Sequence, residues 1–179
     1  MRLIQPTFVL HPGEKGEACA VYSVDVHPDG SRFATAGGDT TVRVWSTGVL
    51  CGATPEQNAP EEDASDDPPP GALLAVLSNH TAVVTVVRWS NSGAMLASGS
   101  DDKYILLWER RAPGAMGAQP FGSTPNAENW CRVAACHGHQ MDVLDVAWAP
   151  DDALLASCSI DNHVLIWRPP RGPGGGAAG

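Results

Sequence analysis

The residues with the greatest catalytic potential in this 179-residue chain are a histidine, a serine and an aspartate that occur together twice. The two sets are His80, Ser98 and Asp102, then His139, Ser157 and Asp161. These residue types can perform nucleophilic acyl transfer, but that chemistry needs one nucleophile in one cleft with an oxyanion hole. Because the sets recur at matching spacing, and polar networks that build folds often imitate triads, we interpret them as structural and predict no enzyme activity.

A tryptophan follows each aspartate by six residues and extends each set to four members. These tryptophans are Trp108 and Trp167. A buried indole N–H needs an acceptor, which the serine hydroxyl can supply while the histidine joins the serine to the aspartate. Each such link contributes about 1 kcal/mol net. We expect each set of four to hold a turn against the strands beneath it.

A third copy of the pattern lies earlier in the chain and is incomplete. Thr35 stands at the serine position, and Asp39 and Trp45 follow at the expected spacing. The position eighteen residues before Thr35 is Glu17, and His11 could reach Thr35 only through a longer loop. The pattern therefore predicts a partial set made of Thr35, Asp39 and Trp45.

Two cysteines and two histidines form a cluster with metal-binding chemistry. The cluster is Cys131, Cys136, His137 and His139. The gap of four residues between the cysteines is not a usual structural-zinc spacing, and His139 already belongs to the second set. No glycine-rich phosphate loop follows a strand and opens a helix. We therefore predict neither a metal nor a cofactor.

Three segments that superimpose without a gap carry these sets: residues 26–45, 89–108 and 148–167. Each starts at a turn (HPDG, SNSG or APDD), continues through an apolar strand and small residues to the aspartate, and ends at the tryptophan. The stretches before them are rich in β-branched and apolar residues, which favours further strands. The chain is predicted to be all-β, with one domain at 1–168 and repeats at about 19–45, 80–108 and 139–167.

The tryptophans that end the repeats are 63 and 59 residues apart, whereas a WD repeat usually takes about 40–45 residues. Each interval should therefore contain an insertion, namely an acidic, proline-rich loop at 46–71 and a glycine- and proline-rich loop at 109–129. Residues 169–179 are predicted to be a disordered tail. The repeat predicts a WD-repeat β-propeller, and because propellers usually close with four to eight blades, these are three of a larger number.

Composition limits the partners of the chain. Eleven basic and twenty acidic residues give a formal net charge of −9, which repels phosphate backbones and argues against direct nucleic-acid binding. The five cysteines are odd in number and form no CxxC pair, a pattern that favours a reducing compartment, cytosol or nucleus. No apolar run is long enough to span a bilayer, so no membrane partner is predicted.

Several phrases resemble a known family more closely than the repeat alone requires. They are MRLIQPTFVLH, SVDVHPDGSRFATAGG, VVRWSNSGAMLASGSDDK, FGSTPNAENWCRV and DVLDVAWAPDDALLASCSIDN. Together they resemble the N-terminal propeller of the HIRA family of histone chaperones over nearly all of residues 1–168. RWSNSG and the FG…W-C/R-V pattern carry the most specific part of this resemblance.

The resemblance implies a nuclear, non-enzymatic scaffold for replication-independent nucleosome assembly and transcription regulation. It implies docking of a ubinuclein-type subunit on the propeller, association with other members of a histone chaperone complex, and indirect contact with histones. Two alternatives stay open, a propeller like the middle subunit of chromatin assembly factor one and a generic WD-repeat adaptor such as a ubiquitin-ligase receptor. The sequence does not identify partner-contacting residues.

Overall fold

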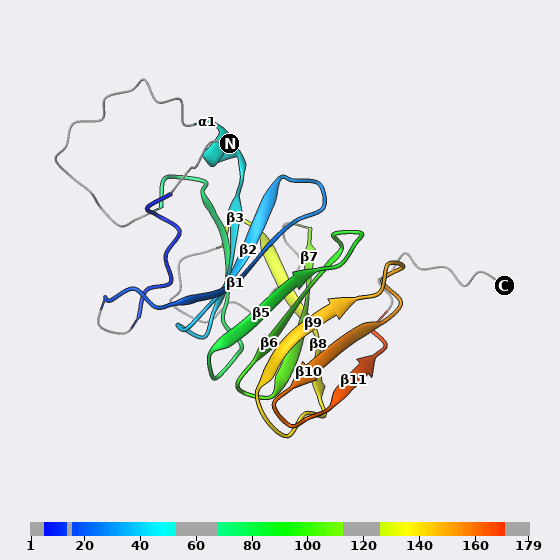
Figure 1. Cartoon of the computed structure of the whole chain (residues 1–179). Helices are drawn as coiled ribbons and strands as arrows, with labels where there is room; N and C mark the ends of the chain where they lie inside the picture. The colour runs from blue at the N-terminus through cyan, green and yellow to red at the C-terminus, as the bar shows by residue number, and fades with distance from the viewer. Residues whose placement is uncertain (1–5, 14–15, 53–67, 113–125, 171–179) are drawn as a thin grey trace, which may run out of the picture.

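The computed structural model describes residues 6–13, 16–52, 68–112 and 126–170, whose strands form three antiparallel sheets (Figure 1). We call them blades 1, 2 and 3. Blade 1 contains β1 (Val21–Val26), β2 (Arg32–Gly37), β3 (Val42–Ser46) and β4 (Leu73–Leu77). Blade 2 contains β5 (Val84–Trp89), β6 (Met95–Ser100), β7 (Tyr104–Arg111) and β8 (Asn129–His137). Blade 3 contains β9 (Val143–Trp148), β10 (Leu155–Ser159) and β11 (Val164–Trp167). The all-β, blade-type prediction is confirmed.

The blades lie face to face, with their first strands β1, β5 and β9 next to one another (Figure 1). Two hydrophobic cores fill the spaces between them. The core between blades 1 and 2 contains Ala34, Ala36, Val42, Val44, Ala75, Leu77, Val84, Val87, Trp89, Leu96, Leu106, Trp108 and Trp130. The core between blades 2 and 3 contains Val86, Ala97, Ile105, Leu107, Val143, Val146 and Leu155. Each blade thus buries a face only against its neighbour, as stacked repeat units do.

Small residues in the second strand of each blade let the sheets approach closely. In β6, all residues after Met95 are buried, so burial along the strand is continuous rather than alternating. A Cβ added to Gly99 would lie 2.7 Å from Val143 Cγ1 in blade 3 and 2.8 Å from Val86 Cγ1. Glycine at this position therefore permits blades 2 and 3 to pack at their observed separation.

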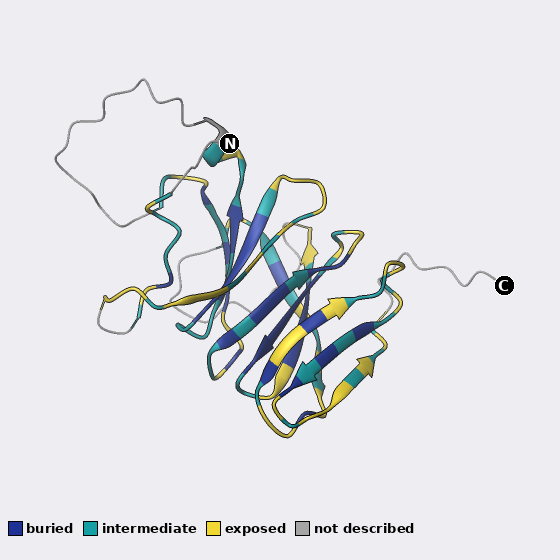
Figure 2. Cartoon of the chain, viewed as in Figure 1, coloured by how far each residue is buried: buried dark blue, intermediate teal, exposed yellow. Residues whose placement is uncertain are grey.

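The two outer faces of the three-blade array are open to solvent at β1 and at β11. Figure 2 shows exposed segments on β1 and on β11, in contrast to the largely buried strands β5 and β6 of blade 2. Val24 and Val26 of β1 are 59% and 57% exposed, and Val164 and Ile166 of β11 are 66% and 60% exposed. In the described residues, these apolar side chains lack the neighbouring blade that covers the corresponding faces inside the array.

The expected loop boundaries need correction. The first predicted loop, 46–71, begins with the end of β3 and includes a short helix, α1 (Gly48–Gly52). The second predicted loop, 109–129, is shorter than expected, because its first residues belong to β7 and its last to β8. Glu109, Arg110 and Arg111 of β7 pair with Cys131, Trp130 and Asn129 of β8. The charged residues at the end of β7 resembled a loop, yet strand pairing tolerates polar side chains that face solvent.

Parts of the predicted loops and tail lie outside the described residues, namely 53–67, 113–125 and 171–179. In the part of the chain that the structure describes, no helix has the length and apolar character needed to cross a membrane.

Candidate functional site

The set of four in blade 2 forms one continuous hydrogen-bond chain. Trp108 Nε1 donates to Ser98 Oγ at 2.9 Å, and that hydroxyl lies 2.8 Å from His80 Nε2. His80 Nδ1 lies 2.8 Å from Asp102 Oδ2. The carboxylate thus favours the tautomer with its proton on Nδ1, so Nε2 accepts from the serine hydroxyl. Asp102 also accepts from the backbone N–H groups of Thr81 and Tyr104, which ties the entering turn to the turn before β7.

Blade 3 repeats this arrangement with its own residues. Trp167 Nε1 donates to Ser157 Oγ at 2.8 Å, and His139 Nε2 lies 2.8 Å from the same hydroxyl. His139 Nδ1 lies 2.9 Å from Asp161 Oδ2. Asp161 accepts the backbone N–H groups of Gln140 and His163, each at 2.9 Å.

Blade 1 carries a complete set, which corrects the expectation of a partial one. His11 Nε2 lies 2.8 Å from Thr35 Oγ1, and His11 Nδ1 lies 2.6 Å from Asp39 Oδ1. Trp45 Nε1 donates to Thr35 Oγ1 at 2.9 Å. His11 precedes Thr35 by 24 residues, whereas His80 precedes Ser98 by 18.

A small excursion of the chain accounts for the longer spacing in blade 1. Cys19 N donates to the His11 carbonyl at 2.6 Å, and Gly13 N donates to the Glu17 carbonyl at 2.7 Å. Pro12 and Ala18 form an isolated antiparallel bridge. Residues 12 and 18 are therefore paired across the excursion, and His11 makes the two side-chain hydrogen bonds that His80 makes in blade 2.

Gly37 is the sequence signal that could have identified His11. The equivalent residues in the other repeats are Ser100 and Ser159, whose hydroxyls donate to the carbonyls of Ala82 and Met141. A Cβ on Gly37 would collide with the imidazole of His11. Glycine, in place of the serine that the other two repeats have here, thus leaves the space that the imidazole of His11 occupies.

The aspartates of these sets are held ionised by their hydrogen bonds. Burial by itself would raise the pKa of Asp102, but the hydrogen bond from His80 and the N–H of Thr81 outweigh it, so this pKa lies below its usual range. Asp39 is shifted in the same direction, because His11 and Thr41 outweigh the opposing effect of burial on its pKa. The aspartates are therefore acceptors rather than proton donors.

The serines of these sets are placed for structure. Ser98 is fully buried and Ser157 is 2% exposed, and both hydroxyls are already engaged by an indole and an imidazole. A nucleophilic serine must instead present its oxygen to a substrate in a cleft. The geometry suits a network that locks each blade.

The residues considered as a zinc cluster are engaged separately. His139 belongs to the set of blade 3, and the ring of His137 stacks on Tyr104 at 4.7 Å. Burial raises the pKa of the Cys136 thiol, which disfavours the thiolate that binds metal. Within the described residues, no three or more His, Cys, Asp or Glu side chains are placed to hold a metal ion.

Two tryptophans that the sequence analysis left unassigned join neighbouring blades. Trp89 Nε1 donates across the seam to the Asp25 carbonyl at 3.3 Å, and Trp148 Nε1 donates to the Arg88 carbonyl at 3.1 Å. Trp89 and Trp148 stand at the same position of their repeats, immediately before the turn. Their recurrence at that position was the available signal.

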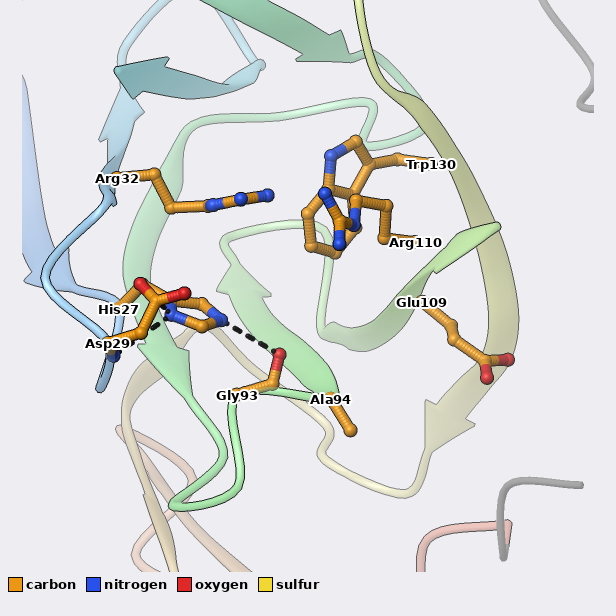
Figure 3. Close-up of a pocket in the computed structure, with 8 residues that line it drawn as sticks. All are labelled: His27, Asp29, Arg32, Gly93, Ala94, Glu109, Arg110 and Trp130. Atoms are coloured by element: carbon orange, nitrogen blue, oxygen red, sulfur yellow. Dashed lines mark hydrogen bonds and ion pairs between the residues drawn. The ribbon is translucent and has the colours of Figure 1, made fainter. Parts of the chain in front are cut away.

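A pocket of about 220 Å³ lies at the seam between blades 1 and 2, and we call it the seam pocket (Figure 3). Blade 1 supplies His27, Asp29 and Arg32, and blade 2 supplies Arg110 and Trp130 among other residues. His27 Nε2 lies 3.1 Å from the Gly93 carbonyl oxygen, and its ring meets Trp89 edge-on at 4.7 Å. These contacts fix the turn of blade 1 against that of blade 2.

Glu128 organises the polar side of the seam pocket. Its Oε1 lies 2.6 Å from Arg32 Nη1 of blade 1 and 3.1 Å from Arg110 Nη1 of blade 2. Its Oε2 accepts the indole N–H of Trp130 at 3.0 Å. One carboxylate thus positions two guanidinium groups and an indole around a single opening. Glu128 and Trp130 belong to FGSTPNAENWCRV, and Gly93 belongs to RWSNSG.

The corresponding turns of blades 2 and 3 are joined by hydrogen bonds. Asp152 accepts hydrogen bonds from Asn91 N at 2.7 Å, Ser92 N at 2.8 Å and Asn91 Nδ2 at 2.9 Å. Asn91 Nδ2 also donates to the Ala149 carbonyl at 2.8 Å. The arginine, imidazole and tryptophan that line the seam pocket are therefore not what the corresponding turns of blades 2 and 3 use, since those turns meet through Asn91, Ser92 and Asp152.

Comparisons with known proteins agree with this architecture. A family model described as the CAF1B/HIR1 beta-propeller domain matches residues 1–173. Protein HIR1 of Mycosarcoma maydis is 42% identical over 170 residues, which cover 93% of this chain and 16% of that protein. Protein HIRA of Homo sapiens is 44% identical over 174 residues, which cover 94% of this chain and 16% of that protein. The chain thus spans about 16% of the length of these relatives.

Solved structures support the same fold. A crystal structure of RRP9 WD40 repeats and a structure of U3-55K each align with a TM-score of 0.59 and 22% sequence identity. Both alignments cover 88% of this chain, and they cover 39% and 40% of the respective structures. From the match over residues 1–173 and the identities to HIR1 and HIRA, this chain belongs to the CAF1B/HIR1 beta-propeller family, as part of the WD-repeat propeller of HIRA and HIR1 proteins.

Proposed function

We propose that this chain is a non-enzymatic protein-interaction scaffold of a HIRA-type histone chaperone complex. The observation that carries the proposal is 42–44% identity to HIR1 and HIRA proteins over more than nine-tenths of the chain. In this role it acts in the nucleus, in replication-independent nucleosome assembly and transcription regulation. It binds a ubinuclein-type subunit and other members of the complex, and it meets histones only through them.

The distribution of polar groups supports a scaffold. The three sets of His, Ser or Thr, Asp and Trp bond to one another within the blades, and their histidines His11, His80 and His139 are buried. The turns and the seam pocket supply chemistry that a partner could recognise. A net charge of −9 is unfavourable for a DNA duplex, which agrees with protein rather than nucleic acid as the direct partner.

A second candidate is the role of the chromatin assembly factor one middle subunit, because the matching family model describes both kinds of propeller. A generic WD-repeat adaptor, such as a ubiquitin-ligase receptor, is the remaining alternative. The identities to HIRA and HIR1 favour the first proposal over both.

A chimera tests the proposal inside a closed propeller. Residues 1–168 of this chain replace the aligned blades of human HIRA, and the control chimera carries the aligned blades of RRP9 instead. We expect the first chimera, and not the control, to restore histone deposition on a non-replicating plasmid in an extract depleted of HIRA. A folded first chimera that restores no deposition would contradict the proposal. Restoration only when DNA is being synthesised would favour the chromatin assembly factor role instead.

A further inference from the structure

The residues that line the seam pocket depart from the internal repeat. Arg32 stands where the second and third repeats have Met95 and Leu154. His27 stands where those repeats have Ser90 and Ala149. Because the other two blades use neutral residues at these positions, the blade fold does not require an arginine or an imidazole there. The side chains of Arg32 and His27 are therefore available for a role beyond building the blade.

The charges around the pocket leave an excess of positive charge on one side. Arg32 and Arg110 share the single carboxylate of Glu128, and the Glu128 and Arg32 side chains are only 14% and 13% exposed. The side chain of Arg110 is 53% exposed and reaches the opening. A guanidinium group has five N–H donors in a rigid fork, so a second carboxylate can be bound beside Glu128.

The other two carboxylates that line the pocket, those of Asp29 and Glu109, form no ion pair with Arg32 or Arg110 in the described structure. Asp29 Oδ1 lies 2.7 Å from His27 Nδ1, and its carboxylate accepts the backbone N–H of Ser31 at 2.8 Å. The carboxylate of Glu109 points away from Arg32 and His27 (Figure 3). The centre of the pocket is thus bordered by Arg32, Arg110 and the ring of Trp130.

The size and rigidity of the pocket limit what it can hold. A volume of about 220 Å³ suits one amino-acid side chain with part of its backbone, and it is smaller than the 300–1,000 Å³ of typical small-molecule sites. Trp130 is 7% exposed and packs on Trp89 at 5.4 Å, so the apolar wall is fixed before any ligand arrives. Such preorganisation reduces the entropy lost on binding.

We propose that the seam pocket binds an acidic side chain of a partner peptide, with its carboxylate on Arg110 and Arg32 and its methylene groups against Trp130. This inference rests on the proposed function, because it names the chemistry by which the scaffold would recognise a protein partner. A single carboxylate is favoured over a nucleic acid because a net charge of −9 repels a polyanion more strongly than it repels one negative charge.

The test uses the whole chain labelled with fluorotryptophan and follows the ¹⁹F resonance of Trp130, identified by its loss in Trp130→Phe. The probes are N-acetyl-L-glutamate and its uncharged analogue N-acetyl-L-glutamine at equal ionic strength. We expect a saturable shift with glutamate only, with a dissociation constant on the order of 1 mM. Arg110→Gln should weaken binding by about tenfold. Arg132→Gln, which removes an exposed arginine of β8 outside the pocket, should leave binding unchanged.

Three results would overturn the proposal: no shift of Trp130, an equal shift with glutamine, or undiminished binding in Arg110→Gln. Each of these can occur while the chimera of HIRA still restores histone deposition, in which case the scaffold function stands and its partner contacts another surface. Conversely, glutamate binding without any deposition would retain the pocket and refute the HIRA-type role.

Discussion

The buried indole N–H of Trp45, Trp108 and Trp167 needs a hydrogen-bond acceptor, and in each blade one serine or threonine hydroxyl supplies it. In blade 2 the hydroxyl of Ser98 accepts from Trp108 and is fixed in turn by His80 and Asp102. Repeated use of these residue types follows from the need to satisfy buried polar groups. We therefore expect their removal to affect folding before any binding property.

The first prediction concerns the stability of blade 2. Trp108→Ala should lower the free energy of unfolding by about 3–5 kcal/mol through the cavity it leaves. Asp102→Ala should cost about 1–3 kcal/mol because His80 loses its partner. The matched control is Asp101→Asn, since burial and the nearby Asp142 and Asp102 raise the pKa of Asp101 and its charge is unfavourable. Equal melting temperatures for all three variants would refute a structural role for the set.

The second prediction concerns acid. The pKa values of Asp39 and Asp102 lie lower in the folded chain than in the unfolded chain, where an aspartate titrates near about 3.9. Their stabilisation is therefore complete above about pH 4 and is lost as the pH falls through the folded values. Urea unfolding at pH 5 and pH 3 should show a smaller loss of stability for Asp102→Asn than for the parent chain. An equal loss in both proteins would contradict this assignment.

Each blade is entered by a turn whose histidine must arrive at a fixed place, although the chain can reach that place by different routes. Blades 2 and 3 use the same spacing from histidine to serine, and blade 1 reaches the same geometry through the excursion that follows His11. What completes each set is thus the placement of the imidazole over the second strand. Sequence spacing is only one way to produce it.

A pair of adjacent glycines tests this view of blade 1. Gly37→Ala should displace His11 and destabilise the blade by about 1–3 kcal/mol, as overpacking does. Gly38→Ala should have little effect, because its added Cβ would meet its nearest neighbours at ordinary contact distances of 3.5 Å or more. Chemical denaturation compares the two variants, and equal stability would show that His11 does not depend on the space at Gly37.

The sequence predicted those features that the repeat itself encodes. The strands of residues 26–45, 89–108 and 148–167 follow from the apolar stretches and the turns, and the sets of blades 2 and 3 follow from their constant spacing. His11 was not identified as the partner of Thr35, because the excursion between the two residues changes the spacing that the other repeats share. The seam pocket could not be predicted for a different reason. Arg32 and Glu128 are 96 residues apart in sequence and meet only because two blades stack.

In the whole molecule, the face of blades 1 and 2 that points away from the hydrogen-bonded set is covered by the next blade. The face of blade 2 opposite its own set packs on blade 3, through Ala97 and Leu107 against Leu155. The equivalent face of blade 3 includes Val164 and Ile166 and is exposed in the described structure. A further blade fits that face, and in a solution of this chain the available blade belongs to a second copy.

The fourth prediction is that the 179-residue chain self-associates with rising concentration. Ile166→Asp should reduce the association, because it places a charge on the exposed face of blade 3. Met141→Asp alters a residue of the same blade with 47% exposure that lies outside the strands, so it serves as the control. Light scattering compares the variants. A parent chain that stays monomeric at every concentration would refute the prediction.

The most direct test of the central claim, that these blades form part of a HIRA-type scaffold, is calorimetric titration of a purified ubinuclein-type subunit. The titrated proteins are human HIRA, the chimera that carries residues 1–168 of this chain, and the chimera that carries RRP9 blades. The account predicts that the first two bind with dissociation constants within about tenfold of each other, a difference of about 1.4 kcal/mol, and that the third does not bind. A correctly folded chimera with residues 1–168 that releases no heat with the subunit would contradict the account.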